Sequence, residues 1–396
     1  MIPNARSVYF DHSATTAVDP RVVEAMLPYF SATYGNPSSI YQVGAAAHSS
    51  IESARATVAD ILGAKPSEII FTSCGTESDN LALRGTAFAN RQHGKHIITT
   101  AIEHPAIIHT CEQLARAFGF SITYLPVDRW GLVDPEDVER AIREDTILIS
   151  VMYANNEVGT IEPLAEIGKV ARSRGIPFHT DAVQAGGYLS LNVDALNVDM
   201  LSLSGHKFYA PKGVGILYVR EGTHLLPTQT GGGQEGGLRA GTENVPYIMG
   251  LAKALELAHE ELVREAPRLI SLRDRLIEGV LGTVPDVFLT GHPTKRLPGS
   301  ASFVFDGIDG EAIIIQLSLA GISASSGSAC ASNSEAPSPV LSAMGVAPRL
   351  AKGGLRVTLG RENTMEDVDY FLSVFPDIIK KLRALSPVYR VGSAAS

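Results

Sequence analysis

The feature that most restricts the fold of this chain is a repeated alternation between short β-rich runs and longer stretches with helical spacing. The β-rich runs are EIIFTS, KHIITTAIE, SITYLPV, TILISVMY, IPFHTDA, DMLSLSG and VGILYVR. Strands that alternate with helices pair in parallel, and the helices then cover the sheet. The sequence therefore predicts an α/β fold whose centre is a mainly parallel seven-stranded sheet.

A second unit is predicted beyond a long helical pattern. From Asn244 to Glu278, apolar residues recur at helical spacing among Glu, Lys and Arg, as in a long half-buried helix that joins two domains. Beyond it, SASFVFDG, GEAIIIQLSLAG, GGLRVTLG and TMEDVDYFLSVFPDIIKKLRAL indicate a smaller α+β unit. The 396 residues, 45% of them hydrophobic, suffice for two domains. We expect a large domain over 15–260 and a small domain formed by 1–14 and 261–396.

Charge and cysteine content restrict the partners. The formal net charge of -9 provides no basic face for nucleic acid. The first residues lack the basic start and apolar stretch of a signal peptide, and no run is apolar enough to span a membrane. Three widely spaced cysteines suggest neither a disulfide framework nor a metal site, and the histidines match no zinc spacing. We therefore expect a cytoplasmic protein with free thiols and no intrinsic metal.

The segment IIFTSCGTESDNLAL predicts a site for an anion. It reads as a strand, a turn of small residues that contains Thr76, and a helix. The first backbone N–H groups of a helix have no partner inside it, so they bind anions such as phosphate. An N-cap box, with Thr76 as the cap and Asp79 three residues later, explains the same pattern without a ligand. Both interpretations stay open at this point.

Polar residues follow two further predicted strands. FHTDAVQ ends with Asp181 and Gln184, and LSLSGHK ends with Ser204, His206 and Lys207. Ligands bind at the carboxyl ends of parallel strands. A lysine among apolar and small residues there loses its charge readily and can form a Schiff base, while an aspartate can keep a pyridinium nitrogen protonated.

Each of these residues also has an explanation without catalysis. Lys207 would be a surface lysine, Asp181 a helix cap and His104 a packing histidine. Their common placement favours the functional interpretation, since the Thr76 turn, His104 in EHPA, Asn156 in ANNEVG, Asp181 and Lys207 all follow strands of one predicted sheet. A single cofactor would use all of these groups.

Ordered motifs extend over nearly the whole chain: YFDHSATT, YGNPSS, FTSCGTESDNLAL, EHPA, NNEVGTIEPL, HTDAVQ, SLSGHKFYAPKGVG, GGGQEGGLRAGTENVP, SSGSACAS and LRVTLGR. In these motifs the chain resembles the cysteine desulfurases of the NifS and IscS type, which belong to the class V aminotransferase family of fold type I pyridoxal phosphate enzymes. The resemblance implies removal of sulfur from L-cysteine, which leaves L-alanine and a persulfide on Cys330. Acceptors for iron–sulfur cluster assembly or thiolation would take that sulfur.

The resemblance also implies how pyridoxal 5'-phosphate is held. Lys207 would bind it as a Schiff base, Asp181 would pair with the pyridine nitrogen, and His104 would stack on the ring and act as an acid or base. Asn156 and Gln184 would bond the side of the ring that carries the phenolic oxygen. The phosphate would be bound by Gly75, Thr76, Ser204, His206 and, from the second subunit of a homodimer, Thr242.

Two further roles follow from the resemblance. Arg356 would bind the substrate carboxylate bidentately, assisted by Asn36 and Asn156. Cys330 would be the nucleophile, delivered by the loop SSGSACASNSEAPSPVL, which is rich in Ser, Ala and Pro. Without the other motifs Cys330 would read as a free loop thiol. In a complex with a scaffold protein it is also a candidate transient ligand for an iron–sulfur cluster.

The chain departs from the family pattern at two positions, and rival functions exist. Cys74 stands where Gly is common, and Gly236 stands where the GGGQERG motif has Arg. Cys74 reads more readily as a small packing residue than as a second reactive thiol. The rival enzyme is a selenocysteine lyase or another carbon–sulfur lyase of the same fold, and the rival from another class is a non-catalytic scaffold.

Overall fold

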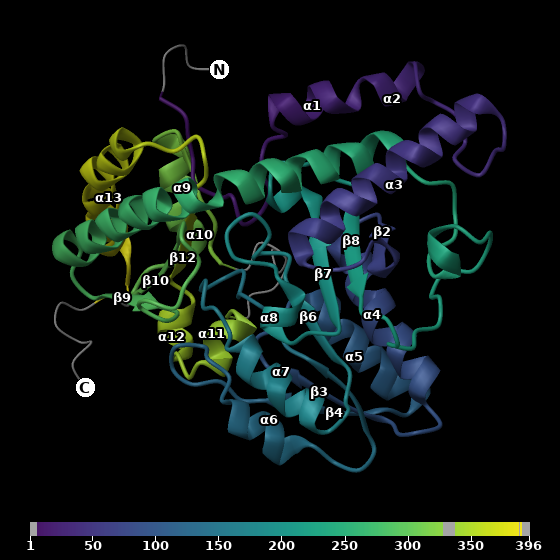
Figure 1. Ribbon diagram of the computed structural model, residues 1–396. Helices are drawn as coiled ribbons and strands as arrows, with labels where there is room; N and C mark the ends of the chain where they lie inside the picture. Colours follow the sequence, from purple (N-terminus) through teal and green to yellow (C-terminus); the bar gives the residue numbers. More distant parts are fainter. Residues whose placement is uncertain (1–5, 328–336, 388, 390–396) are drawn as a thin grey trace.

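The computed structural model describes residues 6–327, 337–387 and 389. Its large sheet has the strand order β2-β8-β7-β6-β5-β3-β4 (Figure 1). The strands are β2 (Ile69–Thr72), β3 (His96–Thr100), β4 (Ser121–Leu125), β5 (Thr146–Ser150), β6 (Phe178–Asp181), β7 (Met200–Ser204) and β8 (Gly215–Val219). Neighbours pair in parallel except β8, which is antiparallel to both β2 and β7. The predicted mainly parallel seven-stranded sheet is confirmed, and each β-rich run forms one strand.

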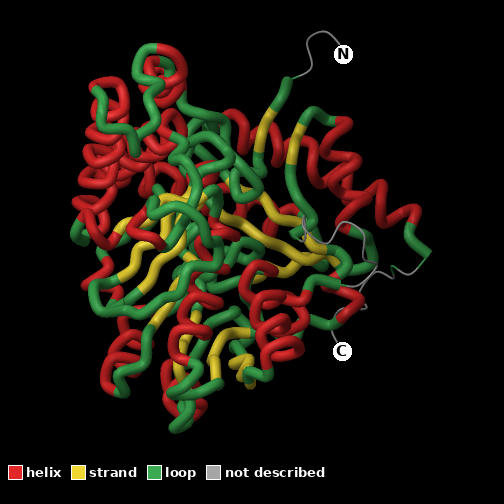
Figure 2. Tube along the Cα trace, turned by 90° about the vertical axis from the view of Figure 1, so that its right-hand side faces the viewer, coloured by secondary structure: helices red, strands yellow, loops and turns green. Residues whose placement is uncertain are grey.

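Helices pack on both faces of this sheet, because successive residues of a strand point to opposite sides and both sides are apolar (Figure 2). Ile97 of β3 belongs to the cluster that contains residues of α4 (Gly75–Asn90) and α5 (Pro105–Phe118). Ile98 belongs to the cluster with α3 (Gln42–Leu62) and α7 (Leu164–Ser173). The shorter helices are α1 (Pro20–Met26), α2 (Pro28–Ser31), α6 (Pro135–Ala141), α8 (Val193–Leu196), η1 (Pro66–Glu68), η2 (Gly205–Lys207) and η3 (Glu235–Gly237).

A second hydrophobic core lies around a three-stranded antiparallel sheet of order β12-β10-β9. The elements of this second unit are β9 (Val287–Thr290), β10 (Ser300–Phe305), α10 (Gly310–Leu319), α11 (Pro339–Ala343), α12 (Pro348–Ala351), β12 (Gly354–Thr358) and α13 (Met365–Leu385), of which α11 and α12 pack in a separate small apolar cluster. The N-terminal β1 (Val8–Tyr9) pairs in parallel with β11 (Ile322–Ser323), so the start of the chain joins this unit. No helix of the described part of the chain has the length and apolarity that a membrane crossing requires.

The predicted long helix is α9 (Val245–Thr283), and it contributes to both cores (Figure 1). Its buried residues as far as Ala258 pack under the large sheet, and those from Leu269 onward pack in the second core. Pro267 lies in the helix just before the second group begins. The domain limits proposed from the sequence remain a prediction, and the passage of α9 from one core to the other agrees with them.

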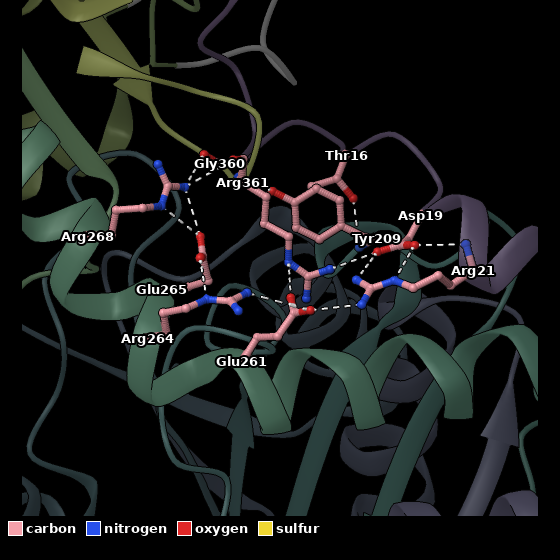
Figure 3. Close-up of polar contacts among 10 residues, drawn as sticks. All are labelled: Thr16, Asp19, Arg21, Tyr209, Glu261, Arg264, Glu265, Arg268, Gly360 and Arg361. Carbon is pink, nitrogen blue, oxygen red and sulfur yellow. Dashed lines mark hydrogen bonds and ion pairs between the residues drawn. The ribbon is translucent and has the colours of Figure 1, made fainter.

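A cluster of ion pairs joins the middle of α9 to the chain around the predicted catalytic lysine (Figure 3). Arg361, just after β12, pairs with Asp19 at 3.1 Å and with Glu261 of α9 at 3.3 Å. Its guanidinium lies 4.4 Å from the centre of the Tyr209 ring, and its backbone N–H donates to the Tyr209 hydroxyl at 2.7 Å. Tyr209 is two residues beyond Lys207, so the cluster braces the lysine segment against both units.

Replacing Arg361 with Ala should lower the free energy of unfolding by about 1–3 kcal/mol, because a largely buried cation that serves two carboxylates and an aromatic ring is lost. Urea unfolding of the protein measures this. Arg275→Ala on the same helix is the matched control, since its pair with Asp369 is half exposed on both sides. Such pairs contribute about 0–1 kcal/mol. Equal effects of the two variants would contradict a bracing role for Arg361.

Candidate active site

A cavity of about 560 Å³ opens where the parallel strands of the large sheet end. It is lined by most of the residues predicted to bind cofactor and substrate: Gly75, Thr76, His104, Asn156, Asp181, Gln184, Ser204, His206, Lys207 and Arg356. These residues come from six separate stretches of sequence. Their convergence makes this cavity the candidate active site.

Three predicted site residues are not among those that line the cavity. Asn36 is exposed, and its side-chain oxygen accepts a hydrogen bond from the backbone of Ser38 at 3.0 Å. Thr242 is exposed in the connection between β8 and α9. Cys330 lies outside the described residues, although Gly327, the last described residue before it, lines the cavity. The roles proposed for these three residues therefore stay predictions.

The start of α4 fits a phosphate group. Its N-cap is Cys74, in extended conformation, and among the described residues no side chain caps the helix. Thr76 lies inside the first turn, so the capping box with Thr76 as its cap is wrong. A Cβ atom at Gly75 would lie 2.7 Å from Val183 Cγ2, a separation that only glycine avoids. The first backbone N–H groups of this 16-residue helix are therefore placed for an anion.

Asp181 ends β6, and Lys207 lies in η2, three residues beyond the end of the neighbouring strand β7; both line the same cavity. Lys207 Nζ donates to the carbonyl oxygen of Ser13 and to that of Ala14, the latter at 3.0 Å. Asp181 is 6% exposed, and its Oδ1 accepts from the Val183 backbone N–H at 2.9 Å. Burial raises the pKa of the Asp181 carboxyl, and the nearby His104 and Lys207 oppose that rise. A buried carboxylate of this kind fits a protonated ring nitrogen as its partner.

His104 has a defined tautomer. It is the N-cap of α5, and its Nδ1 accepts from the Ala106 backbone N–H at 3.1 Å. A nitrogen that accepts carries no proton, so the neutral ring holds its proton on Nε2. Burial lowers the pKa of His104, Lys207 lowers it further, and Asp181 acts in the opposite direction. The packing and catalytic interpretations of this histidine are compatible, because the backbone contact uses Nδ1 and leaves Nε2 available to transfer a proton.

A buried polar network below Asp181 was missed by the sequence reasoning. His179 Nδ1 lies 2.9 Å from Ser150 Oγ, and its Nε2 lies 3.0 Å from Ser202 Oγ and 3.7 Å from Asp79 Oδ1. Burial lowers the pKa of His179 to about 3 and raises that of Asp79 well above its usual range. His179 is two residues before Asp181 on β6, hence on the same face, and this alternation in HTDAVQ was the available signal.

Arg356 lies on β12 and is 3% exposed. Its Nη1 donates to the carbonyl oxygen of Asn156 at 2.7 Å, and its Nη2 pairs with Asp11 Oδ1 at 2.9 Å. Its Nε is buried and has no hydrogen-bond partner within the described part of the chain. A substrate carboxylate would therefore bind beside groups that already orient the guanidinium. Asp11, in the motif FDHSATT, was not singled out from the sequence.

Glu157 is a second buried carboxyl at this end of the cavity, and it was also missed. It follows Asn156 directly and is 9% exposed. Its Oε2 accepts a hydrogen bond from Ser338 Oγ at 2.5 Å. Burial raises the pKa of Glu157 to about 7, although the Ser338 hydrogen bond and the charge of Arg356 both act to lower it.

Of the two departures from the family pattern, the one at Gly236 has a structural explanation, and nothing in the structure explains the one at Cys74. Cys74 lines the cavity and is partly exposed beside the start of α4. Gly236 has a φ of +64° in a turn. Its neighbour Glu235 holds this turn in place, because it pairs with Arg55 at 2.8 Å and accepts from the Phe71 backbone N–H at 2.8 Å. Glycine adopts this left-handed conformation without strain, whereas arginine would not.

The fold and the cavity define a class: a fold type I enzyme that depends on pyridoxal 5'-phosphate. The family model for class-V aminotransferases matches residues 8–371. A cysteine desulfurase IscS of Methanosarcina thermophila is 55% identical over 97% of this chain and 94% of its own. The corresponding protein of Dictyoglomus turgidum is 52% identical over 96% and 97%.

Solved structures give the same result. A NifS-like protein superimposes with a TM-score of 0.89 at 42% identity, covering 95% of this chain and all of that one. The apo structure of a cysteine desulfurase from Thermococcus onnurineus NA1 superimposes with a TM-score of 0.84 at 29% identity, covering 95% of each chain. The chain therefore belongs to the class-V aminotransferase family and, within it, to the pyridoxal phosphate-dependent cysteine desulfurases.

The raised pKa of Glu157 predicts that the difference in stability between wild type and the Glu157→Gln variant depends on pH. The folded protein keeps this proton up to about pH 7, whereas the unfolded chain releases it near the ordinary value of 4.5, so stability is lost as the pH rises between these values. Glu157→Gln avoids this loss. Relative to wild type, the variant should gain up to about 3 kcal/mol between about pH 4 and pH 8, since one pKa unit corresponds to about 1.4 kcal/mol.

Urea unfolding of both proteins across this pH range measures the difference. Glu278→Gln, at an exposed position of α9, is the control and should show little change with pH. A difference between Glu157→Gln and wild type that does not vary with pH would show that Glu157 ionises equally readily in both states.

Proposed function

We propose that this enzyme removes sulfur from L-cysteine and yields L-alanine and a persulfide on Cys330. The observation that carries the proposal is the placement of Lys207, Asp181 and Arg356 around one cavity whose lining includes Gly327. Cys330 is three residues beyond Gly327, and three residues of extended chain reach about 10 Å. The thiol is therefore within reach of the space between the lysine and the arginine.

The residues divide the work of binding and proton transfer. Pyridoxal phosphate, when bound, withdraws electrons from the bonds of the amino acid attached to it. Asp181 would hold the ring nitrogen, His104 would cover the ring, and the α4 N-terminus with Thr76, Ser204 and His206 would hold the phosphate. Arg356 would fix the substrate carboxylate. Lys207 Nζ, once displaced by the substrate amine, would take the proton from the α carbon.

Sulfur transfer needs no external oxidant. The Cys330 thiolate attacks the substrate sulfur and forms an S–S bond, while the bond from that sulfur to the β carbon breaks. The electron pair of the broken bond stays with the carbon skeleton, which takes up a proton and leaves as alanine. The Cys330 sulfur is oxidised to a persulfide and the β carbon is reduced. Attack requires the thiolate, since the neutral thiol is a poor nucleophile.

The assembly we propose is a homodimer in which Thr242 contributes to the partner's phosphate site. Thr242 is exposed in the connection between β8 and α9. Glu235, in the same connection, accepts a hydrogen bond from the backbone N–H of Phe71 on edge strand β2. A group of large exposed apolar residues also lies in one stretch that runs from α1 to the start of α3: Val23, Leu27, Phe30, Tyr34, Ile40, Tyr41 and Val43. An exposed apolar face of this kind is typical of a subunit interface. The second copy would cover it.

The sulfur would pass from Cys330 to a protein acceptor. The relatives named IscS support an iron–sulfur cluster scaffold as one acceptor, and a thiolation protein is another. In a complex with a scaffold, Cys330 would be available as a transient ligand to a cluster that the scaffold holds. We place this activity in the cytoplasm, where free thiols stay reduced.

Alanine formed from L-cysteine in the presence of pyridoxal phosphate and a reductant tests the proposal. Wild type should form alanine, and Cys330→Ala should form at least about a hundredfold less while it still binds the cofactor, because the nucleophile is absent. Lys207→Ala should lose the absorbance of the lysine-linked cofactor. Equal alanine formation by wild type and Cys330→Ala would instead favour a selenocysteine lyase or another carbon–sulfur lyase.

Sedimentation of the holoenzyme tests the dimer. Wild type should sediment as a dimer at micromolar concentration, and the double variant Tyr34→Glu, Ile40→Glu should shift toward monomer, because two charges would have to be buried. Val263→Glu on α9 is the control, since Val263 is a well-exposed apolar residue outside this stretch. A monomeric wild type, or an equal shift in the control, would contradict this interface.

A further inference from the structure

We propose that Glu77 and Arg239 are positioning residues for the cofactor phosphate. Their ion pair ties the connection that carries Thr242 to the turn at 73–77, here called the phosphate turn, of the same subunit. The inference rests on the proposed function, because Thr242 completes a phosphate site only in the proposed homodimer. Each phosphate turn would thereby place the threonine that the other subunit's phosphate site requires. Neither side chain of the pair needs to touch the cofactor itself.

The Glu77 end of the pair is built into the phosphate turn. Glu77 lies in the first turn of α4 and follows Thr76, which lines the active-site cavity. Its Oε2 accepts from the backbone N–H of Ser73 at 2.7 Å and from the Ser73 hydroxyl. These contacts hold the residue after β2 against the start of the helix. The Glu77 carboxylate therefore moves with the phosphate turn.

The other oxygen of this carboxylate, Oε1, accepts from Arg239 Nε at 2.9 Å. The two side chains are only 20% and 21% exposed. Burial raises the pKa of Glu77, but Arg239 and Ser73 outweigh this effect and hold the pKa below its ordinary value. Glu77 is therefore ionised at neutral pH, and its contact with Arg239 is a charge-assisted hydrogen bond.

The connection between β8 and α9 lies beside α4 at the β2 edge of the large sheet (Figure 1). Leu226 N–H donates to the carbonyl oxygen of Gly85, in the second half of α4, at 3.1 Å. Leu225 and Leu238 pack against the apolar cluster to which α4 contributes. Arg239 follows Leu238 directly and reaches the start of the same helix. The connection is thus attached to α4 at both ends of the helix.

Thr242 lies three residues beyond Arg239, and its neighbours are fixed on both sides. The side-chain oxygen of Gln234 accepts from the Gly241 backbone N–H at 3.0 Å, which closes the loop between these two residues. Asn244 is the N-cap of α9, and its side chain accepts a backbone N–H of that helix. The position of Thr242 therefore depends on that of Arg239, while its own side chain is exposed toward a second subunit.

A purely electrostatic role of the pair is a distinct alternative, and it predicts opposite effects for the two residues. Glu77 is adjacent to Thr76, so removal of its negative charge alone would strengthen the binding of a phosphate. Removal of the Arg239 cation alone would weaken it. A positioning role predicts that both removals weaken the binding, because either one releases the connection that carries Thr242. The direction of the Glu77 effect therefore decides between the two roles.

The test measures the dissociation constant of pyridoxal 5'-phosphate for the full-length dimer from the absorbance of the lysine-linked cofactor. Glu77→Gln and Arg239→Ala should each raise this constant about tenfold, and the double variant should be no worse than either one, because the two side chains act through one contact. Thr242→Ala should raise it at least as much, and addition of Arg239→Ala to Thr242→Ala should weaken the binding no further.

Two controls separate this role from a general loss of structure. Pyridoxal, which lacks the phosphate, should bind every variant within about twofold of wild type, because the lost contact serves the phosphate alone. Lys65→Ala is the matched variant: it removes the pair with Glu221, in the same connection, in which both side chains are largely exposed. Its dissociation constant for pyridoxal 5'-phosphate should stay within about twofold of wild type, because an exposed pair contributes little.

A lower dissociation constant in Glu77→Gln, an unchanged one in Arg239→Ala, or an equal loss of pyridoxal binding would each overturn the proposal. An unchanged constant in Thr242→Ala, or a monomeric wild type, would refute the role of Thr242 and the inference with it. Failure of the proposed sulfur transfer has a different signature. In that case Cys330→Ala would form alanine as fast as wild type, and the binding constants would still decide the role of Glu77 and Arg239.

Discussion

The site depends on one geometric constraint, the common direction of five strands in the large sheet. β3, β5, β6 and β7 are parallel, and β8 is antiparallel to both β7 and β2, so two reversals return β2 to the direction of the others. Each of these five strands therefore delivers its following residues to the same edge. The groups concerned are far apart in sequence, and only backbone pairing inside the sheet brings them to one cavity.

Burial determines how the charges in that cavity behave. Asp181, Asp79 and Glu103 are all nearly inaccessible, and burial raises the pKa of each carboxyl. Burial also lowers the pKa of His179, which lies on β6 two residues before Asp181, and so keeps its ring neutral. Of these carboxyls, Asp181 is the one that His104 and Lys207 act to keep ionised. The carboxyl on which these two side chains act is therefore also the one placed where a cationic ring nitrogen would be most stabilised.

Patterns within short stretches of sequence were enough to predict the fold and many of the residues that line the cavity. The residues that were missed are placed by contacts between positions far apart in the chain. The β-rich runs and the helical spacing of α9 are readable within a short window, and Lys207 and Asp181 stand where those runs end. Glu157 and Ser338 are 181 positions apart, and Asp11 and Arg356 are 345 apart, so no local pattern relates them. The alternative that made Thr76 the cap of α4 is wrong, because turn chemistry alone does not say which residue begins a helix.

Arg356, the proposed substrate arginine, lies on β12 of the second unit, while Lys207 follows β7 of the large sheet and lines the same cavity. Arg356 is therefore placed by contacts that cross between the units: to the carbonyl oxygen of Asn156 and to Asp11. The Arg361 cluster, five residues further along, braces the lysine segment through Tyr209. One short stretch of the second unit thus contacts both the loop that follows β5 and the segment that follows Lys207. Any shift of that unit relative to the large sheet would move Arg356 and Lys207 against each other, so the ion pairs along α9 would support the geometry that the proposed reaction requires as well as the stability of the fold.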